Sequence, residues 1–249
     1  MKKKLGQNFL IDENVATREV SYANISKNDI VLEIGPGKGI LTKLLAEKAK
    51  EVIAIEIDLN LIDELKRKLP SNVKLIHNNA LKIDFFTLPK FNKIVSNLPF
   101  QISSPITFKF LEYNFDIAVL IYQEEFANRM VARYGNNDYS RLSVGIYYKA
   151  KCEILEKVSK TCFKPRPKID SCIIKLTRRN TPPFNVIDES FFFNLTKKLF
   201  SYRRKKIKNI INEYYQISDK RIPYTENRVE ELTPEQIGNL SNFLFKIKS

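Results

Sequence analysis

The chain of 249 residues has few of the residues that metal and nucleophilic chemistry need. Its single histidine, His77, follows an apolar run and is most simply a residue at the end of a strand. The cysteines Cys152, Cys162 and Cys172 are odd in number, form no Cys-x-x-Cys pair and have no histidine companions. We therefore expect no disulfide framework, no metal site and no active site built on serine and histidine.

Long apolar runs and an excess of acidic residues are missing as well. The longest apolar run, residues 117–122, is far shorter than the roughly 20 residues of a membrane-spanning helix. The lysines after Met1 precede no sustained apolar segment of the kind that signal peptides have. We expect no membrane partner and a cytoplasmic location. The 42 Lys and Arg against 28 Asp and Glu give a formal charge of +14, which favours a polyanionic partner such as nucleic acid.

The stretch Val31–Thr42 (VLEIGPGKGILT) joins an apolar run to three glycines at alternate positions, Gly35, Gly37 and Gly39. This pattern predicts a strand, a tight turn and the start of a helix. Glycines are needed where the backbone takes a positive φ or approaches a ligand closely, and the helix that follows points free N–H groups into the gap. The stretch predicts a site for a small polar ligand, but a plain turn would fit it equally well.

The first two thirds of the chain alternate between expected strands and helices, which indicates a parallel sheet. The expected strands are residues 30–34, 52–57, 73–77, 93–96 and 115–122. The expected helices are residues 13–23, 40–49, 59–69, 104–113, 124–132 and 141–149, and Ser103 or Ser104 is the expected N-cap of the fourth. Two extended runs, residues 152–158 and 171–176, predict an antiparallel hairpin at the edge of the sheet.

A domain boundary is expected near Thr181-Pro182-Pro183, because the rest of the chain has only helical patterns, at residues 189–199, 203–215 and 234–246. A part of about 65 to 70 residues is at the small end of what folds alone. The expected fold class is α/β, with a Rossmann-like domain over residues 1–180 and a small C-terminal helical domain over residues 181–249.

Polar residues end the expected parallel strands, where ligands bind in open α/β sheets. Glu56 ends the second strand about 20 positions after Gly35, the offset of a carboxylate that takes ribose hydroxyls. Asn79 follows the third strand and Asn97 follows the fourth. Together they predict a cofactor that contains a nucleoside.

The glycine spacing favours S-adenosylmethionine over NAD as that cofactor. It is Gly-x-Gly-x-Gly, not the Gly-x-Gly-x-x-Gly by which a helix N-terminus meets a pyrophosphate. Glu33, just before the glycines, would repel a phosphate but suits the sulfonium and ammonium groups of S-adenosylmethionine.

The tetrapeptide Asn97-Leu98-Pro99-Phe100 can supply what methylation of an exocyclic amine requires. The lone pair of adenine N6 is delocalised into the ring, so the protein must accept both amino hydrogens and turn the lone pair toward the methyl group. The Asn97 side-chain oxygen can be one acceptor. The Leu98 carbonyl can be the other, because Pro99 restricts Leu98 to extended conformations. Phe100 can stack on the base, although the tetrapeptide alone could also be a simple turn.

Taken together, these motifs resemble the KsgA-type adenine-N6,N6-dimethyltransferases of small-subunit ribosomal RNA, to which the Erm-type large-subunit enzymes are related. The matching segments are LGQNFL at 5–10, EIGPGKGILT at 33–42, EID at 56–58, NLPF at 97–100, SRLSV at 140–144 and FKPRPKIDS at 163–171. The resemblance implies a methyltransferase domain that binds S-adenosylmethionine. It also implies dimethylation of two adjacent adenosines near the 3′ end of small-subunit rRNA, in an immature ribosomal subunit and by a monomer.

The resemblance also implies roles for single residues. Asn8 and Leu10 would border the methionine end of the cofactor, and Phe163 would cover the second face of the target base. Gly35 and Gly37 would form the turn that binds the cofactor, Glu56 would bind its ribose and Asn79 its adenine. Asn97 would contact both the cofactor and the target base. One position departs from the family pattern, and another does not distinguish the KsgA type from the Erm type. Asn79 stands where the family usually has Asp, and Phe100 stands where the KsgA type commonly has Tyr and the Erm type often has Phe.

Two basic segments predict contacts with RNA. Residues 157–179 hold eight Lys and Arg and one acid, and residues 203–208 form a second basic cluster at the start of an expected helix. With the charge of the whole chain, phosphate contact is favoured over a merely solvated face. The residues expected to bind RNA are Lys164, Arg166, Lys168, Arg203, Arg204, Lys205 and Lys206.

Three other functions stay open from the sequence. The first is an Erm-type enzyme that acts on large-subunit rRNA and confers antibiotic resistance. The second is a ribosome-assembly factor whose methylation is dispensable. A DNA adenine methyltransferase is disfavoured, because such enzymes usually need an added target-recognition region.

Overall fold

The structure, a computed structural model, describes residues 7–217 and 220–248. The chain divides into two compact units, one made of residues 1–127 and 151–178 and the other of residues 128–150 and 179–249. The sequence predicts that residues 128–150 belong to the first domain. They group with the second unit because Tyr139, Val144 and Tyr148 belong to its hydrophobic core. Residues 5 and 6 of the LGQNFL motif lie outside the described residues.

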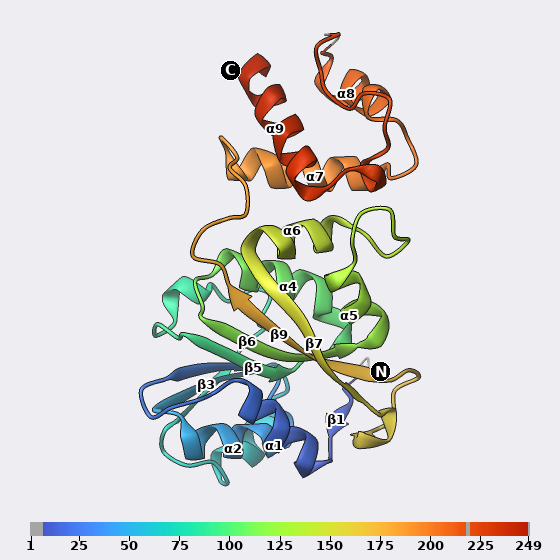
Figure 1. Cartoon of the computed structure of the whole chain (residues 1–249). Coiled ribbons are helices and arrows are strands. Elements are labelled where there is room, and N and C mark those ends of the chain that lie inside the picture. The colour runs from blue at the N-terminus through green and yellow to red at the C-terminus, as the bar shows by residue number, and fades with distance from the viewer. Residues whose placement is uncertain (1–6, 218–219, 249) are drawn as a thin grey trace. The chain divides into compact units, whose positions relative to one another are not determined.

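Within the described residues, seven strands of the first unit form one sheet in the order β4-β3-β2-β5-β6-β9-β7 (Figure 1). The five strands from β4 to β6 are parallel, as expected, and β9 pairs antiparallel with β6. The two strands of the expected hairpin, β7 and β9, are neighbours at one edge of the sheet. Strand β9 lies next to β6, and β7 forms the edge. The strand bounds are Ile30–Ile34 (β2), Glu51–Glu56 (β3), Val73–His77 (β4), Lys93–Asn97 (β5), Ile117–Gln123 (β6), Ala150–Val158 (β7) and Ser171–Arg178 (β9).

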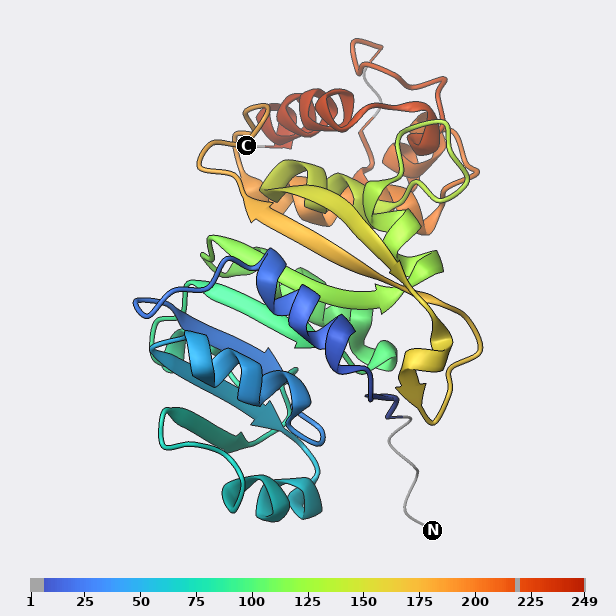
Figure 2. The same ribbon diagram turned by 60° about the horizontal axis from the view of Figure 1, so that its bottom comes forward.

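Helices cover both faces of this sheet. Figures 1 and 2 show α1 and α2 on one face and α4 on the other. Apolar residues of α1 and α2 share a core cluster with residues of the strands that they cover, among them Val31, Val52 and Val95. The bounds are Glu13–Tyr22 (α1), Ile40–Lys48 (α2), Leu59–Lys66 (α3), Ser103–Glu112 (α4) and Glu124–Val131 (α5), with short 3-10 turns at Phe85–Thr87 (η1), Phe100–Ile102 (η2) and Lys160–Cys162 (η3).

The start of α4 differs from the expectation. Neither serine caps the helix, because Ser103 is already its first residue and Ile102 occupies the N-cap position without a side-chain bond. The Ser103 hydroxyl donates to the Phe100 carbonyl at 2.9 Å. The reason is that the 3-10 turn η2 runs directly into α4, so the chain enters the helix already wound.

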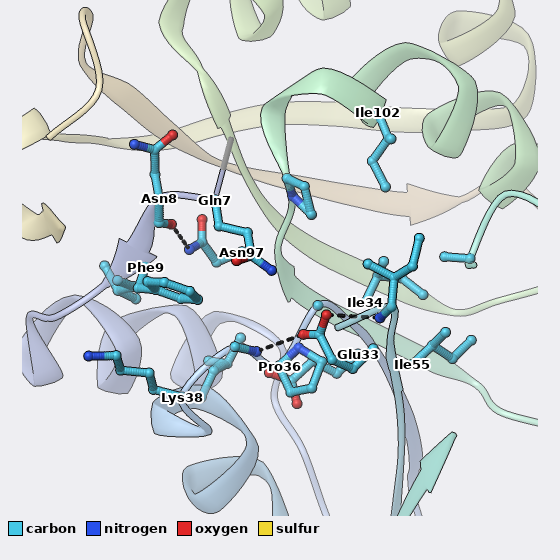
Figure 3. Close-up of a pocket in the computed structure, with 18 of the residues that line it drawn as sticks. Gln7, Asn8, Phe9, Glu33, Ile34, Pro36, Lys38, Ile55, Asn97 and Ile102 are labelled. Carbon is cyan, nitrogen blue, oxygen red and sulfur yellow. Dashed lines mark hydrogen bonds between the residues drawn. The ribbon is translucent and has the colours of Figure 1, made fainter. Parts of the chain in front are cut away.

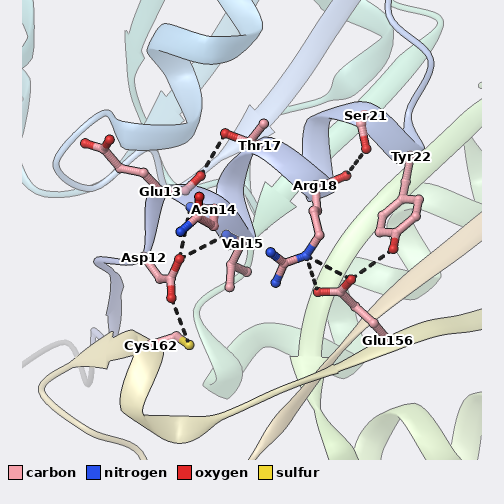
Figure 4. Close-up of polar contacts among 10 residues, drawn as sticks. All are labelled: Asp12, Glu13, Asn14, Val15, Thr17, Arg18, Ser21, Tyr22, Glu156 and Cys162. Atoms are coloured by element: carbon pink, nitrogen blue, oxygen red, sulfur yellow. Dashed lines mark hydrogen bonds and ion pairs between the residues drawn. The ribbon is translucent and has the colours of Figure 1, made fainter.

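A short N-terminal strand joins two segments that are far apart in the chain. Phe9–Leu10 (β1) pairs antiparallel with Phe163–Lys164 (β8) in a two-stranded sheet. The next residue but one, Asp12, caps α1 by accepting from two backbone N–H groups, and the Cys162 thiol donates to it at 3.5 Å (Figure 4). Farther along α1, Arg18 and Tyr22 both bind Glu156 of β7. These contacts fasten α1 to the segment around residue 160.

The second unit is helical and rich in aromatic residues. Its helices are Arg141–Lys149 (α6), Glu189–Ser201 (α7), Ile207–Tyr215 (α8) and Pro234–Lys248 (α9), with a 3-10 turn at Val229–Glu231 (η4). The basic residues 203–206 precede α8 instead of opening it. Lys206 takes an extended conformation, with φ −63° and ψ 144°, so it serves as the N-cap position and the helix begins only at Ile207.

Neither unit contains a helix suited to crossing a bilayer, as far as residues 7–217 and 220–248 are concerned.

Candidate functional site

A pocket of the first unit lies at the carboxyl ends of β2, β3, β4 and β5 (Figure 3). Four loops and the N-terminal segment line it, with residues 7–10, 33–38, 40, 41, 55–57, 78–81, 97, 99, 101 and 102. The structure brings together in this lining all the residues that were predicted to bind the cofactor, namely Asn8, Leu10, Gly35, Gly37, Glu56, Asn79 and Asn97.

Strand alternation explains why the polar residues of the site converge. Side chains two apart in a strand point to the same face of the sheet. Val31, Val52 and Val95 face the cluster with α1 and α2, so Glu33, Glu56 and Asn97, at even spacing from them, belong to that face too. The three polar side chains therefore lie at one end of the sheet and on one face.

The glycine turn has the backbone that its composition predicted. Gly35, Gly37 and Gly39 all have positive φ, at 72°, 57° and 82°. Gly37 is also a place of close approach, because a Cβ atom there would lie 2.8 Å from Cδ1 of Phe9. The turn and β1 thus fit against each other only when position 37 has no side chain.

Glu56 is a buried carboxyl group held by the backbone. Oε1 accepts from the N–H of Ile57 at 2.8 Å and of Asp58 at 2.9 Å, and Oε2 accepts from Gly37 at 3.3 Å. Burial raises the pKa of Glu56, while these backbone bonds oppose the rise. The bonds fix the carboxyl group at the floor of the turn, between the ends of β2 and β3.

Glu33 is the second buried acid of the lining and has an acidic neighbour outside the pocket. Its exposed fraction is 1%, and burial raises its pKa to about 8, with Glu56 adding to the rise. Glu19 of α1 is fully buried, and burial followed by the charge of Glu33 raises its pKa well above 4.5. Both oxygens of Glu19 and Oε2 of Glu33 have no hydrogen-bond partner in the described part of the protein.

Asn97 leaves one polar atom without a partner at the edge of the pocket. Its Nδ2 donates to the carbonyl of Asn8 at 3.3 Å, a bond drawn in Figure 3. Its Oδ1 is buried and has no partner among the described residues. Pro99 lines the pocket beside Gly35, whereas Leu98 is buried and its side chain lies outside the lining. The free oxygen of Asn97 can accept a hydrogen from a ligand.

The two aromatic residues predicted to hold the target base contact each other. The ring centroids of Phe100 and Phe163 are 6.2 Å apart, and the planes are inclined at 66°. Phe163 is 3% exposed. In this arrangement the rings meet edge to face, so a base could lie between them only if one ring moved.

The two predicted RNA-binding segments differ in their pairing. Lys164, Arg166 and Lys168 are exposed, and no ion pair within the described ranges involves them. In the second unit Arg204 is exposed, but its neighbours are engaged. The ion pairs are Arg203 with Glu230, Lys205 with Glu213 and Lys206 with Glu226. Arg203 also donates to the carbonyls of Asn136 and Asn137.

Histidine, cysteine and acidic side chains form no cluster that could hold a metal ion, within residues 7–217 and 220–248.

A family model for ribosomal RNA adenine dimethylase matches residues 1–246. The chain belongs to the ribosomal RNA adenine dimethylase family. This membership confirms the resemblance found in the sequence. It also confirms that the protein is an rRNA adenine methyltransferase.

Relatives of this dimethylase chain match it over nearly its full length. It is 45% identical to the probable ribosomal RNA small subunit methyltransferase A of Methanococcus aeolicus, covering 98% of this chain and 97% of the relative. It is 46% identical to the protein of the same name from Methanosarcina acetivorans, covering 98% of this chain and 93% of the relative.

Solved structures show the same fold. A dimethyladenosine transferase from Plasmodium falciparum matches with a TM-score of 0.79 and 29% identity, over 96% of this chain and 98% of that one. The 23S rRNA methyltransferase ErmE matches with a TM-score of 0.68 and 27% identity, over 96% of this chain and 100% of that one. The Rossmann-like methyltransferase fold predicted for the dimethylase is confirmed.

Sequence reasoning missed two features of the dimethylase site. One is the pairing of β1 with β8, extended by a bond from Asn8 Nδ2 to the Pro165 carbonyl at 2.7 Å. Strands of two residues carry no periodicity, so nothing in the sequence could indicate it. The other is Lys109, whose Nζ donates to the carbonyls of Ala80 and Ile83. A lysine within the largely apolar helix α4 was a signal that could have been noticed.

Proposed function

We propose that the protein uses S-adenosylmethionine to dimethylate N6 of two adjacent adenosines near the 3′ end of small-subunit rRNA, within an immature ribosomal subunit. The names of its archaeal relatives support the small subunit as the target. We also propose that it acts as a monomer and in the cytoplasm, where the subunit would be assembled.

The residues of the pocket fit the proposed cofactor. Two buried carboxyl groups, Glu33 and Glu56, lie in the wall, and their oxygens can accept from the ammonium group and the ribose hydroxyls of the ligand. Ile57 and Leu81 offer apolar surface at the far end. Lys38, a cation of the lining, is exposed, and its Nζ lies 5.7 Å from the centroid of the Phe9 ring. S-adenosylmethionine, when bound, supplies the methyl group.

One observation carries the proposed reaction: Oδ1 of Asn97 is buried at the edge of the pocket and has no partner among residues 7–217 and 220–248. A buried acceptor of this kind costs about 1–3 kcal/mol unless a ligand donates to it. The amino group of adenine is such a donor. With the Leu98 carbonyl as the second acceptor, Asn97 would bind both hydrogens of N6 and turn its lone pair toward the cofactor.

The remaining groups would position the target adenosine. Phe100 would stack on the base, and Phe163, after a movement of either ring, would cover the second face. The adenosine must leave its stack to reach Asn97. The exposed side chains of Lys164, Arg166 and Lys168 would bind phosphates, together with the cluster Arg203, Arg204, Lys205 and Lys206 in the second unit.

The test is incubation of the protein with labelled S-adenosylmethionine and immature small subunits, followed by nucleoside analysis and mapping of the label. We expect N6,N6-dimethyladenosine at two adjacent positions near the 3′ end of the small-subunit rRNA. Asn97→Ala should lose the label. Label on large-subunit rRNA alone would contradict the proposal.

The similarity to ErmE makes the Erm-type reaction the second candidate, and the same mapping on both subunits separates the two. The role of an assembly factor is tested in a strain depleted of the enzyme. If Asn97→Ala abolishes methylation yet restores subunit assembly there, binding is the essential function and methylation is dispensable.

A further inference from the structure

Asn79 opens a tight turn directly after β4, and one end of its side chain is occupied by that turn. Its Oδ1 accepts from the N–H of Leu81 at 2.9 Å. A backbone N–H needs an oxygen, so this bond determines which end of the amide faces the turn. Nδ2 is left over, and in the described part of the chain no hydrogen bond uses it. Asn79 therefore presents a donor.

The turn that carries Asn79 is held from a second side. Lys109 of α4 donates from Nζ to the carbonyl of Ala80 at 2.9 Å and to that of Ile83, and it lies 4.4 Å from the centroid of the Phe85 ring. Within the turn, the Asn79 carbonyl accepts from Ile83 N–H at 3.1 Å. These bonds fix the backbone from Asn79 to Ile83, so the side chain of Asn79 has little freedom to reverse.

The position of Asn79 corresponds to the base of a nucleoside ligand. Glu56, the ribose carboxyl of the proposed function, ends β3, and its register partner His77 ends the neighbouring edge strand β4. A ligand that continues past Glu56 therefore reaches the loop after β4. There the apolar side chains of Ile57 and Leu81 line the pocket while 46% and 37% exposed, and can cover a flat ring.

We propose that Asn79 is a specificity-determining residue that contacts the cofactor base through a hydrogen-bond donor, so that the pocket accepts a 6-oxopurine as well as adenine. The inference rests on the proposed function, since it needs S-adenosylmethionine as the cofactor. The exocyclic amine of adenine is itself a donor and gains nothing from Nδ2, whereas a ring nitrogen of adenine or the oxygen of a 6-oxopurine accepts from it.

Aspartate at this position would present a hydrogen-bond acceptor to the cofactor base in place of a donor. One carboxylate oxygen can accept from Leu81 N–H and the other from the adenine amine, while the oxygen of a 6-oxopurine is repelled. A site that hydrogen-bonds one group discriminates strongly against an analogue that cannot form the bond. Asn79→Asp keeps the cap of the turn and changes only the group that faces the ligand.

The experiment measures dissociation constants by calorimetry, without RNA, for S-adenosylhomocysteine and S-inosylhomocysteine. We expect the wild-type protein to bind the two compounds within about threefold of each other. Asn79→Asp should prefer the adenosyl compound by about tenfold or more. Asn28→Asp adds the same charge to an exposed side chain of the first unit outside the pocket lining, and should keep the wild-type ratio.

The wild-type ratio tests the inference even if a variant fails to fold. A preference of tenfold or more for the adenosyl compound in the wild-type protein would overturn the inference and leave S-adenosylmethionine as the cofactor. Equal ratios in the wild-type protein and Asn79→Asp would overturn it as well. If the wild-type protein binds neither compound, both this inference and the proposed cofactor are wrong.

Discussion

Glu19 shows how one side chain can make the stability of the first unit depend on pH. It is fully buried between α1 and the sheet, both of its oxygens lack partners in the described residues, and its electrostatic neighbour is the acid Glu33. Burial raises the pKa of both acids, that of Glu33 to about 8. The folded state therefore keeps protons that the unfolded chain loses above its ordinary pKa near 4.5.

The sign follows from this difference in bound protons. At pH 4 both states are protonated and the acids cost little. As the pH rises from about 4.5 to 8, ionisation of these acids stabilises only the unfolded chain. The free energy of unfolding therefore falls. We expect Glu19→Gln to be about 1–3 kcal/mol more stable than the wild type at pH 8 and nearly equal to it at pH 4, in urea unfolding monitored by circular dichroism.

Glu13→Gln is the matched control, because it makes the same change at an exposed position of the same helix, and it should not reproduce the gain in stability at pH 8. A variant Glu19→Gln that is less stable than the wild type at pH 8 would show that Glu19 is ionised and paired in the folded protein.

Phe100 is expected to matter more for the second methylation than for the first. A monomethylated N6 has one hydrogen left, so one of the two acceptors, Asn97 Oδ1 or the Leu98 carbonyl, loses its bond. Stacking on Phe100 must then hold the base. Phe100→Ala should slow the second transfer about tenfold more than the first in single-turnover assays that resolve both nucleosides. Equal losses for the two steps would contradict this role.

At the scale of elements, the glycine turn between β2 and α2 depends on the close approach of β1. A Cβ atom at position 37 would meet the Phe9 ring at 2.8 Å, and the residue has φ 57°. We expect Gly37→Ala to lose about 1–2 kcal/mol through backbone strain alone. It should also bind S-adenosylhomocysteine at least tenfold more weakly, because Phe9 must leave the pocket wall. Thermal unfolding and calorimetry measure the two effects.

Gly135→Ala separates the effect of backbone strain from the effect of displacing the Phe9 ring. Gly135 also has a positive φ, 79°, but a Cβ atom there would meet nothing within 4 Å. It should lose stability by a similar strain and keep its affinity for S-adenosylhomocysteine. If both variants bind equally well, the approach of Phe9 to the turn has no part in the site.

The strands and the positions of the site residues could be predicted from the sequence, because they depend on short-range patterns. Apolar runs mark β2 to β6, and in a parallel sheet the residues that end them, such as Glu56 and Asn97, converge. The grouping of α6 with the second unit could not be predicted. Periodicity shows that residues 141–149 are a helix with an apolar face but not which core receives it.

Predictions from charge were the least informative at this scale. The run of residues 203–206 was expected to open a helix but precedes α8, and Arg203, Lys205 and Lys206 each pair with a glutamate from another segment. RNA binding by this run stays a prediction. Composition shows that a segment is basic. It does not show where the compensating acids lie, because they come from residues up to 27 positions away.

At the scale of the whole molecule, the charge of +14 predicts that RNA binding is strongly weakened by salt. A triple variant in which Gln replaces Lys164, Arg166 and Lys168 should have a slope of log K against log salt that is less steep by about 2. This value assumes that all three side chains contact phosphates of single-stranded RNA. Filter binding of small subunits at several salt concentrations measures this slope. A slope equal to that of the wild type would show that this segment does not bind phosphate.

Arg203→Gln is a useful comparison in the same assay. Arg203 is engaged with Glu230 and with two backbone carbonyls, so we expect its loss to lower the melting temperature in addition to the salt slope. Arg204→Gln, at an exposed neighbour, should lower the slope by about 0.7 and leave the melting temperature unchanged.

The pairing of β1 with β8 also sets an order of events during protein synthesis. Asn8 and Pro165, which bond across this pair, are separated by 157 positions in the chain. The ribosome releases the N-terminal segment first, so Asn8 and Phe9 must wait for most of the first unit to be translated before their partners exist. Until then the wall of the pocket that they form is unfinished, and no cofactor can stabilise the nascent chain there. Newly made β6, whose edge is covered by β9 in the finished sheet, is exposed during the same interval.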